Sequence, residues 1–251
     1  MTSIKQTDML QELQKIPENS IDCLVTDPPY KLVPGGASTK NEKRPSGIIN
    51  RNVNVNARTG NLFDFNNITF DTWLPEVYRV LKPKSHAYIF ISGRRLNELT
   101  NEALKVGFVW QNLLAWRKQN VTPNRYYMNR CEFILMLRKG GAKPINNMGS
   151  TTCLEFLNPT GNKTHPTEKP VDLLKHLILN STNKGETVLD PFMGTGNTGI
   201  ACIDTGRNFI GYEIDKKFFL IAEEKLNFAD KENQNEPKQE LFNRGNKVPH
   251  K

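Results

Sequence analysis

The sequence contains no long apolar run. None of its 251 residues lies in a stretch approaching the roughly 18 apolar residues that a membrane-spanning helix needs, and the opening MTSIKQTD does not resemble a secretory signal peptide. Cysteine is also scarce. The four cysteines lie far apart in the sequence, and none forms a C-x-x-C pair. Neither a disulfide framework nor a zinc site is therefore expected, and we predict no membrane association, no bound metal and a reducing, cytoplasmic location.

Acidic residues are outnumbered by basic ones. The sequence has 34 Lys and Arg against 26 Asp and Glu, a net charge of +8. The excess is concentrated in residues 31–61, with six basic residues against one acid, and in residues 117–143, with seven against one. A solvated loop can carry such charge, but two such segments in one chain favour a polyanionic partner.

Short apolar runs typical of buried strands alternate with helical patterns along the chain. Helical periodicity is found in DMLQELQKI, DTWLPEVYRVL, PVDLLKHLILN and KKFFLIAEEKL. The alternation predicts an α/β fold with a doubly wound, mostly parallel sheet. The predicted strands cover residues 20–26, 86–92, 109–117, 131–138, 186–190 and 208–214.

The predicted domain covers residues 1–229. Two irregular inserts interrupt it, at residues 31–69 and 139–164, and inserts of this length in a compact domain are usually functional. The polar stretch 230–251 has little apolar content, so we predict a disordered tail there.

A glycine loop follows the predicted strand at 186–190, in TVLDPFMGTGNTG. Gly194 and Gly196 allow a tight turn and close approach of a ligand. Glu213, at the end of the next strand, is suited to ribose hydroxyls. The loop is not G-x-G-x-x-G and has no Walker lysine, and Asp190 would repel a pyrophosphate. With Phe192 as an apolar face, the loop favours an adenosyl ligand over NAD or ATP, although taken alone it could be a simple turn.

The stretch VTDPPYKL ends another predicted strand with an acid, two prolines and a tyrosine. In doubly wound sheets ligands bind beyond the carboxyl ends of the strands, so this corner and the glycine loop are expected to face one crevice. Pro28 and Pro29 stiffen the corner and remove two N–H donors. Asp27 and the Pro28 carbonyl can accept hydrogen bonds from an exocyclic amine, and Tyr30 can stack on a base. The alternative is a proline turn with a capping Asp.

Such a corner suits methylation of an amine on a nucleobase. The lone pair of an adenine N6 amine is delocalised into the ring, so the amine is a weak nucleophile. Two acceptors that grip its hydrogens would localise the lone pair for attack on a sulfonium methyl group, by positioning and electrostatics alone.

At these residues the chain resembles the β group of amino-methylating DNA (adenine-N6) methyltransferases, over about residues 3 to 227. The most specific matching stretches are TDPPY, HPTEKP and LDPFMGTG, in that order, with NRCEFILMLRKG and FIGYEID in support. The resemblance implies the Rossmann-like methyltransferase fold with permuted motif order, and S-adenosylmethionine as the cofactor.

The resemblance also implies site residues. The catalytic corner would be Asp27, Pro28, Pro29 and Tyr30. Asp8, just after a short N-terminal strand, would contact the cofactor adenine, and HPTEKP would close over the methionine moiety. The full set of cofactor contacts expected is Asp8, Met9, Asp27, His165, Thr167, Glu168, Lys169, Asp190, Phe192, Gly194, Thr195, Gly196, Asn197, Thr198, Glu213 and Ile214.

The implied partner is double-stranded DNA, from which the target base must be flipped out. Insert 139–164 is short for a target-recognition region, so recognition is expected to be shared with residues 31–69. Tyr126 and Tyr127 would pack either near the flipped base or in the core. By analogy with relatives, a homodimer and a cognate restriction endonuclease are also expected. The predicted DNA contacts are Lys31, Lys43, Arg44, Arg51, Arg58, Arg117, Lys118, Arg125, Arg138 and Lys139.

Four other functions stay open on the sequence alone. N4-cytosine methylation uses the same chemistry, but those enzymes more often resemble Ser-Pro-Pro-Tyr, so Asp27 favours adenine. Methylation of RNA or of a protein glutamine is typical of Asn-Pro-Pro-Tyr. An inactive nucleic-acid-binding relative is disfavoured by the intact acids and glycines, and an NAD oxidoreductase by Asp190.

Overall fold

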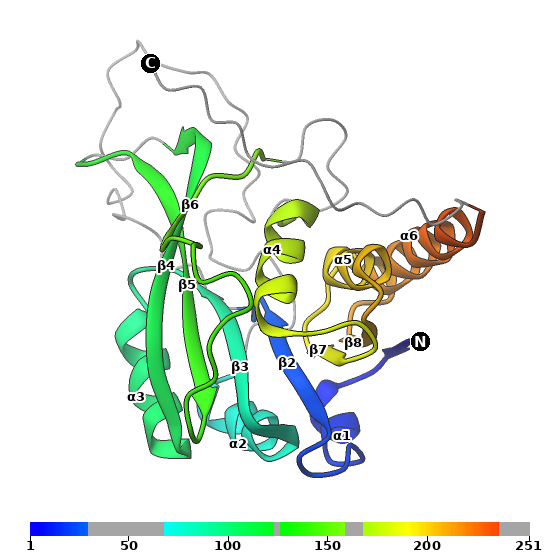
Figure 1. Ribbon diagram of the computed structural model, residues 1–251, viewed down its shortest axis with the longest axis horizontal. Helices are drawn as coiled ribbons and strands as arrows, with labels where there is room; N and C mark the ends of the chain where they lie inside the picture. Colours follow the sequence, from blue (N-terminus) through cyan, green and yellow to red (C-terminus); the bar gives the residue numbers. More distant parts are fainter. Residues whose placement is uncertain (30–67, 123–125, 159–167, 236–251) are drawn as a thin grey trace, which may run out of the picture.

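The computed structural model describes residues 1–29, 68–122, 126–158 and 168–235. Within these ranges it contains one eight-stranded sheet and six helices (Figure 1). The strands are β1 (Thr2–Gln6), β2 (Ile21–Thr26), β3 (Leu81–Ile91), β4 (Phe108–Thr122), β5 (Asn129–Lys139), β6 (Cys153–Leu154), β7 (Thr187–Asp190) and β8 (Asn208–Glu213). The helices are α1 (Met9–Leu13), α2 (Phe70–Val80), α3 (Leu96–Val106), α4 (Val171–Ser181), α5 (Asn197–Thr205) and α6 (Lys216–Asn235).

The strand order in the sheet is β1-β8-β7-β2-β3-β5-β4-β6. The five strands from β1 to β3 in this order are parallel to one another. Strand β5 is antiparallel to both β3 and β4, and β6 is parallel to β4. The predicted mostly parallel sheet is therefore confirmed, and the antiparallel β4–β5 hairpin extends it on one side.

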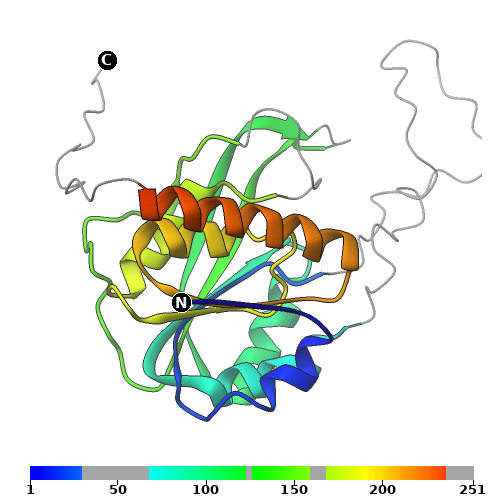
Figure 2. The same cartoon turned by 90° about the vertical axis from the view of Figure 1, so that its right-hand side faces the viewer.

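Helices cover both faces of the sheet, as a doubly wound fold requires (Figure 2). On one face α1, α2 and α3 pack over a cluster that includes Leu24 of β2. On the other face α4, α5 and α6 pack over a second cluster, which includes Val25. Successive side chains of a strand point to opposite faces, so β2 feeds both cores and reads as a continuous apolar run.

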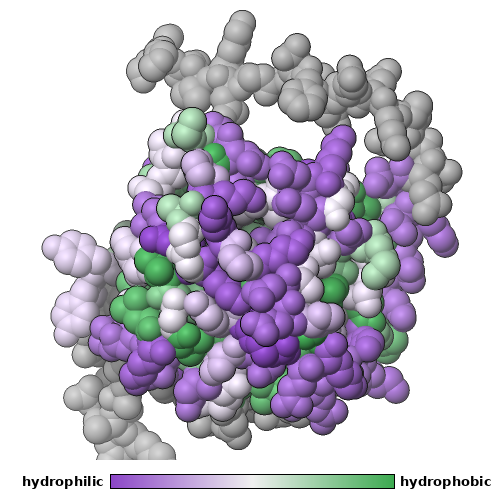
Figure 3. All heavy atoms as spheres, turned by 60° about the horizontal axis from the view of Figure 1, so that its bottom comes forward, coloured by the Kyte–Doolittle hydropathy of each residue, from purple (hydrophilic) through white to green (hydrophobic). Residues whose placement is uncertain are grey.

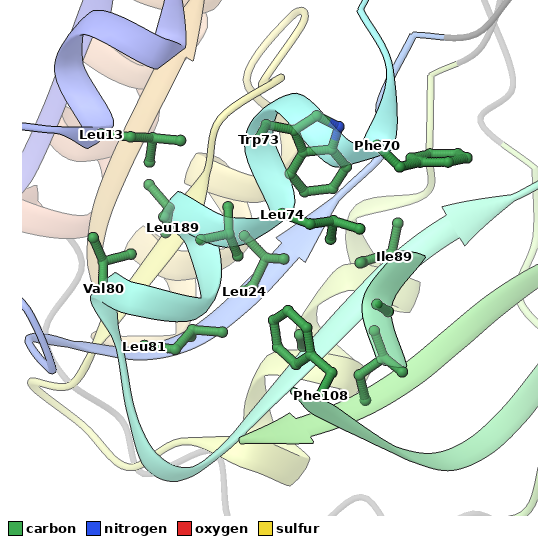
Figure 4. Close-up of a cluster of buried hydrophobic side chains, with 14 of the residues drawn as sticks. Leu13, Leu24, Phe70, Trp73, Leu74, Val80, Leu81, Ile89, Phe108 and Leu189 are labelled. Atoms are coloured by element: carbon green, nitrogen blue, oxygen red, sulfur yellow. The ribbon is translucent and has the colours of Figure 1, made fainter. Parts of the chain in front are cut away.

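The first cluster shows how the sequence pattern makes the helix α2 (Figure 4). Trp73, Val77 and Val80 recur at helical spacing and are each fully buried against the sheet. Pro75 is the sixth residue of α2, so it removes the hydrogen bond that an N–H there would donate to the Asp71 carbonyl, and the buried face of the helix must offset this cost. Burial of each large apolar side chain contributes about 1.5–3 kcal/mol, so this face holds α2 in place.

Two helices differ from the sequence predictions. Helix α3 was not predicted, although Leu99 and Ala103 are buried at a spacing of four residues. Helix α6 runs to Asn235, so the predicted disordered tail is wrong for residues 230–235. Ala229 packs against the core and Asn233 Nδ2 donates to the Ile203 carbonyl at 3.1 Å, which holds the polar end of this helix. Residues 236–251 lie outside the described part.

Much of the insert at 139–164 is packed against the domain, in the portion the structure describes. Nε2 of His86 lies 3.0 Å from the Lys143 carbonyl, and the Asn146 N–H donates to the Asn180 carbonyl at 2.8 Å. The chain then returns to the sheet edge as β6, where the Trp116 indole donates to the Phe156 carbonyl at 3.0 Å. This portion of the insert is anchored to the scaffold.

The connections between the strands indicate where a ligand-binding crevice is expected. The chain leaves β7 through α5 to reach β8, and leaves β2 through α2 to reach β3, in opposite directions across the sheet. Strands β7 and β2 are neighbours, so the point where the strand order reverses lies between them. In doubly wound sheets ligands bind at this point, outside the carboxyl ends of the strands.

The surface at the bottom of Figure 1 is mostly hydrophilic, with scattered apolar side chains (Figure 3). Among the residues that the structure describes, no helix has both the length and the apolar character needed to cross a bilayer.

Candidate active site

Four carboxylates lie at the carboxyl ends of four neighbouring parallel strands. Asp8 comes two residues after β1, Glu213 ends β8, Asp190 ends β7, and Asp27 directly follows β2. The order β1-β8-β7-β2 in the sheet therefore sets these acids side by side along one edge. This is the edge at which the strand order reverses, where a ligand is expected.

Asp190 joins the end of β2 to the glycine loop. Its Oδ1 accepts hydrogen bonds from the Thr26 hydroxyl at 2.7 Å and from the Phe192 N–H at 3.1 Å. Its Oδ2 accepts one from the Thr198 hydroxyl of α5, also at 2.7 Å. Burial raises the pKa of Asp190 to about 6, against the opposing effect of these hydrogen bonds. Both oxygens are thus engaged by the chain, and the predicted contact of Asp190 with the cofactor stays a prediction.

The glycine loop turns tightly around Glu213. Gly194 and Gly196 have φ of 53° and 83°, which L side chains rarely adopt. The N–H groups of Gly194 and Asp215 donate to the two carboxylate oxygens of Glu213 at 2.9 and 2.8 Å. A Cβ on Gly196 would lie 3.0 Å from the Ala222 Cβ, so this glycine lets the loop pack on α6. A Cβ on Gly194 would meet no atom within 4 Å, so this glycine faces open space.

Glu213 is held by neutral groups only, as far as the described residues go. Its hydrogen-bond donors are backbone N–H groups, and burial raises its pKa to about 7. A half-buried carboxylate held in this way retains acceptor capacity for hydroxyl donors. The role of Glu213 toward ribose hydroxyls stays a prediction.

Asp27 lies in the crevice with a lysine on one oxygen. Its side chain is 25% exposed, and Nζ of Lys169 lies 2.7 Å from Oδ2. Burial raises the pKa of Asp27, while the Lys169 ammonium group opposes that rise. Pro28 is buried and Pro29 half-buried directly after it. Tyr30, the last residue of the predicted corner, lies outside the described part.

The segment directly before α4, residues 168–170, contacts the glycine loop. Glu168 accepts a hydrogen bond from the Thr195 hydroxyl at 2.9 Å and pairs with Lys225 of α6. The side-chain N–H of Asn197 donates to the Lys169 carbonyl at 2.8 Å. Lys169 thus connects the glycine loop to Asp27, and these two predicted parts of the site are brought together. The predicted contacts His165 and Thr167 lie outside the described residues.

The remaining cofactor candidates have different surroundings. Asp8 is exposed and caps α1, because its Oδ1 accepts from the Leu10 N–H at 3.0 Å. Met9 is buried in the core beneath α1, and Ile214 is 40% exposed. The Thr7 N–H donates to the Glu213 carbonyl at 2.9 Å, which fixes the end of β1 beside that of β8.

Two of the predicted DNA-binding residues lie near the crevice and two lie far from it. Arg117 pairs with Glu155 at 2.8 Å and Lys118 with Glu132 at 2.6 Å, at the end of the hairpin near the carboxyl end of β3. Arg138 and Lys139 are at the opposite end of β5, where Lys139 donates to backbone carbonyls. The structure therefore separates this pair from the site. The other candidates, Lys31, Lys43, Arg44, Arg51, Arg58 and Arg125, lie outside the described part.

The structure adds residues that sequence reasoning missed. Glu132 of β5 lies 3.1 Å from Lys169, although in the sequence it was only the single acid of a basic segment. Thr26 holds Asp190, and its position directly before Asp27 was the only available signal. Tyr126 and Tyr127 are 85% and 93% exposed, so they do not pack in the core. Within the described residues, no group of three or more His, Cys, Asp or Glu is placed to hold a metal ion.

Comparison with known proteins places this geometry in context. A family model described as DNA methylase matches residues 21–224. The type II methyltransferase M2.MboI of Moraxella bovis is 30% identical, over 95% of this chain and 92% of that protein. The crystal structure of M1.HpyAVI in complex with S-adenosylmethionine is 28% identical, with a TM-score of 0.67, over 90% of this chain and all of the other.

A further solved structure is similar in fold alone. The PvuII DNA methyltransferase, which is cytosine-N4-specific, has a TM-score of 0.67 over 93% of each chain, at 18% identity. The same scaffold thus occurs in an enzyme that acts on the cytosine amine.

Proposed function

We propose that this chain, which belongs to the DNA methylase family of S-adenosylmethionine-dependent enzymes, methylates the N6 amine of adenine in double-stranded DNA. Family, cofactor and DNA substrate follow from similarity along most of the chain. The choice of adenine is our inference from the residues of the site.

The residues present fit the cofactor. Gly194 faces open space in which a side chain would find no neighbour, and Glu213 beside it is a half-buried carboxylate whose partners among the described residues are N–H groups. A carboxylate in this state can accept from ribose hydroxyls. Phe192 offers an apolar surface and is itself fixed by an edge-to-face contact with Trp73, with 5.3 Å between ring centroids. Residues 192–196, Glu213 and Asp8 would hold the cofactor.

S-adenosylmethionine, when bound, supplies an electrophilic methyl group on a sulfonium sulfur. The chain must then bring an amine into line with that group and raise its nucleophilicity. In this proposal Asp27 would accept one amine hydrogen, and the Pro28 carbonyl would accept the other. The amine nitrogen gains the methyl group and gives up one proton, which the Asp27 carboxylate can hold.

The single observation that carries this proposal is the link between Asp27 and the glycine loop. Thr26 and Asp190 tie the strand ends together at 2.7 Å, and Lys169 contacts both Asp27 and, through its carbonyl, Asn197. These contacts support the proposal that the acceptor for the amine and the turn that would hold the methyl donor lie together at one edge of the sheet.

Asp27 also supports adenine over cytosine, because the N4-cytosine enzymes more often resemble Ser-Pro-Pro-Tyr. N4-cytosine methylation is the second candidate, since the PvuII enzyme has the same fold. Nuclease digestion of the methylated DNA followed by mass spectrometry distinguishes N6-methyladenine from N4-methylcytosine. Detection of N4-methylcytosine alone would overturn the choice of adenine.

DNA contacts on the described surface are proposed for Arg117, Lys118 and the exposed Tyr126 and Tyr127 near the end of the β4–β5 hairpin. The two basic side chains would bind phosphates, and a tyrosine could fill the space left by the flipped base. We further propose a methyltransferase domain of residues 1–235, a cytoplasmic location, and, by analogy, a homodimer and a cognate endonuclease.

The test of the proposed function is Asp27→Ala, with Asp172→Ala as the matched control. Asp172 is 82% exposed, at the start of α4. We expect Asp27→Ala to bind S-adenosylmethionine by calorimetry and to lose tritium transfer to duplex DNA by at least about 100-fold, as expected when a group that positions the reactant is removed. Asp172→Ala should match the wild type. Wild-type turnover by Asp27→Ala would contradict the proposed role of the corner.

A further inference from the structure

Lys169 is shared between two carboxylates at the substrate side of the crevice. Its Nζ lies 2.7 Å from Asp27 Oδ2 and 3.1 Å from Glu132 Oε2, and the side chain is 11% exposed. Asp27 follows β2 and Glu132 lies on β5, with β3 between them in the sheet. The ammonium group lies over Phe90 of β3, 5.1 Å from the ring centroid. The lysine therefore bridges across three strands.

Glu132 in turn has a second cation. Its Oε1 lies 2.6 Å from Nζ of Lys118, and the two side chains are 33% and 21% exposed. Asp27, Lys169, Glu132 and Lys118 thus form a row in which negative and positive charges alternate and cancel. Glu132 is the central carboxylate of this row, and its two oxygens bind different lysines.

Lys169 occupies Oδ2 of Asp27, so an amine that uses this oxygen must compete with the ammonium group. A poorly exposed ammonium group strongly resists the loss of a carboxylate partner. Glu132 lowers this resistance, because it can stay bonded to Lys169 when Asp27 turns to the amine. We infer that Glu132 is a positioning residue, which retains Lys169 while Asp27 engages the target amine.

This inference rests on the function proposed above, in which Asp27 receives that amine. Lys118 has an opposing part, since it draws one oxygen of Glu132 away from Lys169. Removal of the Glu132 charge should therefore tighten the pair of Lys169 with Asp27. Removal of the Lys118 charge should loosen it.

The two removals should shift the pH dependence of kcat in opposite directions. Asp27 faces Lys169 from the segment before α4, Glu132 from β5 and Asp190 from the end of β7. Glu132 raises the pKa of Asp27 and Lys169 lowers it. In Glu132→Gln the acidic limb of kcat, which reports ionised Asp27, should move to lower pH. In Lys118→Gln it should move to higher pH.

The experiment measures kcat against pH at saturating S-adenosylmethionine and duplex DNA for the wild type and both variants. The matched control is Glu102→Gln, which removes a carboxylate paired with Lys105 on the surface of α3. We expect kcat of Glu132→Gln to fall about 10- to 100-fold, as for a misplaced reacting group, with an unchanged Kd for S-adenosylmethionine. The Glu102→Gln variant should keep the wild-type kcat and pH profile.

The inference fails if Glu132→Gln matches Glu102→Gln in kcat, or if the two acidic limbs shift in the same direction, as a purely structural role would allow. Should Glu132→Gln not fold, Lys118→Gln decides alone, and an acidic limb that stays in place overturns the inference. A wild type that methylates no amine overturns the proposed function and this inference with it. An active wild type with unshifted variants overturns the inference alone.

Discussion

Two pairs of carboxylates lie along the same edge of the sheet, and they are held by different kinds of groups. On the proposed cofactor side, Asp190 and Glu213 accept hydrogen bonds from hydroxyl and N–H groups. On the proposed substrate side, Asp27 and Glu132 bind lysine ammonium groups. Burial raises the pKa of Asp190 to about 6 and that of Glu213 to about 7.

The difference separates two tasks. Neutral donors fix the position of a carboxylate and leave its charge available to a neutral ligand such as a sugar hydroxyl. A lysine ammonium group can instead exchange one carboxylate partner for another, so it can release a carboxylate when a substrate enters. For Glu132, burial favours the neutral form, but Lys169 and Lys118 outweigh it and hold the pKa below its usual value. The proposed cofactor side thus favours a fixed geometry, and the proposed substrate side favours the exchange of partners that we infer.

The largest expected effect comes from Glu213→Gln, which weakens the cofactor side. Loss of a charged acceptor costs about 1.5–3 kcal/mol, so Kd for S-adenosylmethionine measured by calorimetry should rise about 10- to 100-fold. Glu224→Gln, an exposed change on α6, is the control and should leave Kd unchanged. A Kd for Glu213→Gln equal to that of the control would show that Glu213 does not contact the cofactor.

The same variant should alter the pH dependence of stability without cofactor. The folded-state pKa of Glu213 is raised above its ordinary value of 4.5, so its contribution to stability is complete below that pH and is lost as pH rises through about 7. Between about pH 4 and pH 8 the wild type should therefore lose about 1–3 kcal/mol of its free energy of unfolding that Glu213→Gln, which does not titrate at this position, does not lose. Denaturant unfolding of both proteins at these two pH values checks the sign of the difference.

A smaller effect is expected from Thr198→Val, which removes one neutral donor from Asp190. A buried carboxylate oxygen left without its donor should lower the free energy of unfolding by about 1–3 kcal/mol. Thr205→Val on the same helix is the matched control, since the Thr205 hydroxyl bonds only carbonyls of its own helix. Equal loss of stability in the two variants would show that Asp190 does not depend on Thr198.

The smallest effect tests a buried polar network outside the crevice. The Ser181 hydroxyl lies 2.8 Å from both His86 Nδ1 and the Tyr88 hydroxyl. Ser181→Ala should lower the free energy of unfolding by about 1 kcal/mol and leave Kd for S-adenosylmethionine unchanged, because no ligand-facing group is lost. A weaker Kd would show that this network is coupled to the crevice.

The pH dependence of this network runs opposite to that of Glu213. Burial lowers the pKa of His86, so its contribution to stability is present above the ordinary value of 6.5 and is lost as pH falls below it. His86→Gln should reduce that loss, which unfolding curves on either side of the ordinary value would show.

The parts of the site that follow strand ends could be predicted from the sequence. Asp27, Asp190 and Glu213 each end an apolar run, and a parallel sheet brings such ends to one edge. The lysine row could not be predicted, because Glu132 reaches Lys169 only through the antiparallel pairing of β5 with β3. No local pattern records that pairing.

The secondary structure, like the site, could be predicted from the sequence only in part. Apolar runs predicted the core of each long strand, whereas the polar ends of β4 and β5 carry no such signal. Residues 230–235 are helical because α6 continues from a packed portion, although their own composition suggested disorder. For Arg138 and Lys139, charge alone predicted DNA contacts that the register of β5 places at the far end of the strand.

The central claim is that Asp27 and the loop at residues 194–196 serve one bound methyl donor. A crystal structure of the protein with S-adenosylmethionine tests it most directly. We predict that the donor contacts Gly194 and Glu213 and presents its methyl group toward the Asp27 carboxylate. A donor bound with its methyl group directed away from Asp27, or at a different edge of the sheet, would contradict the account.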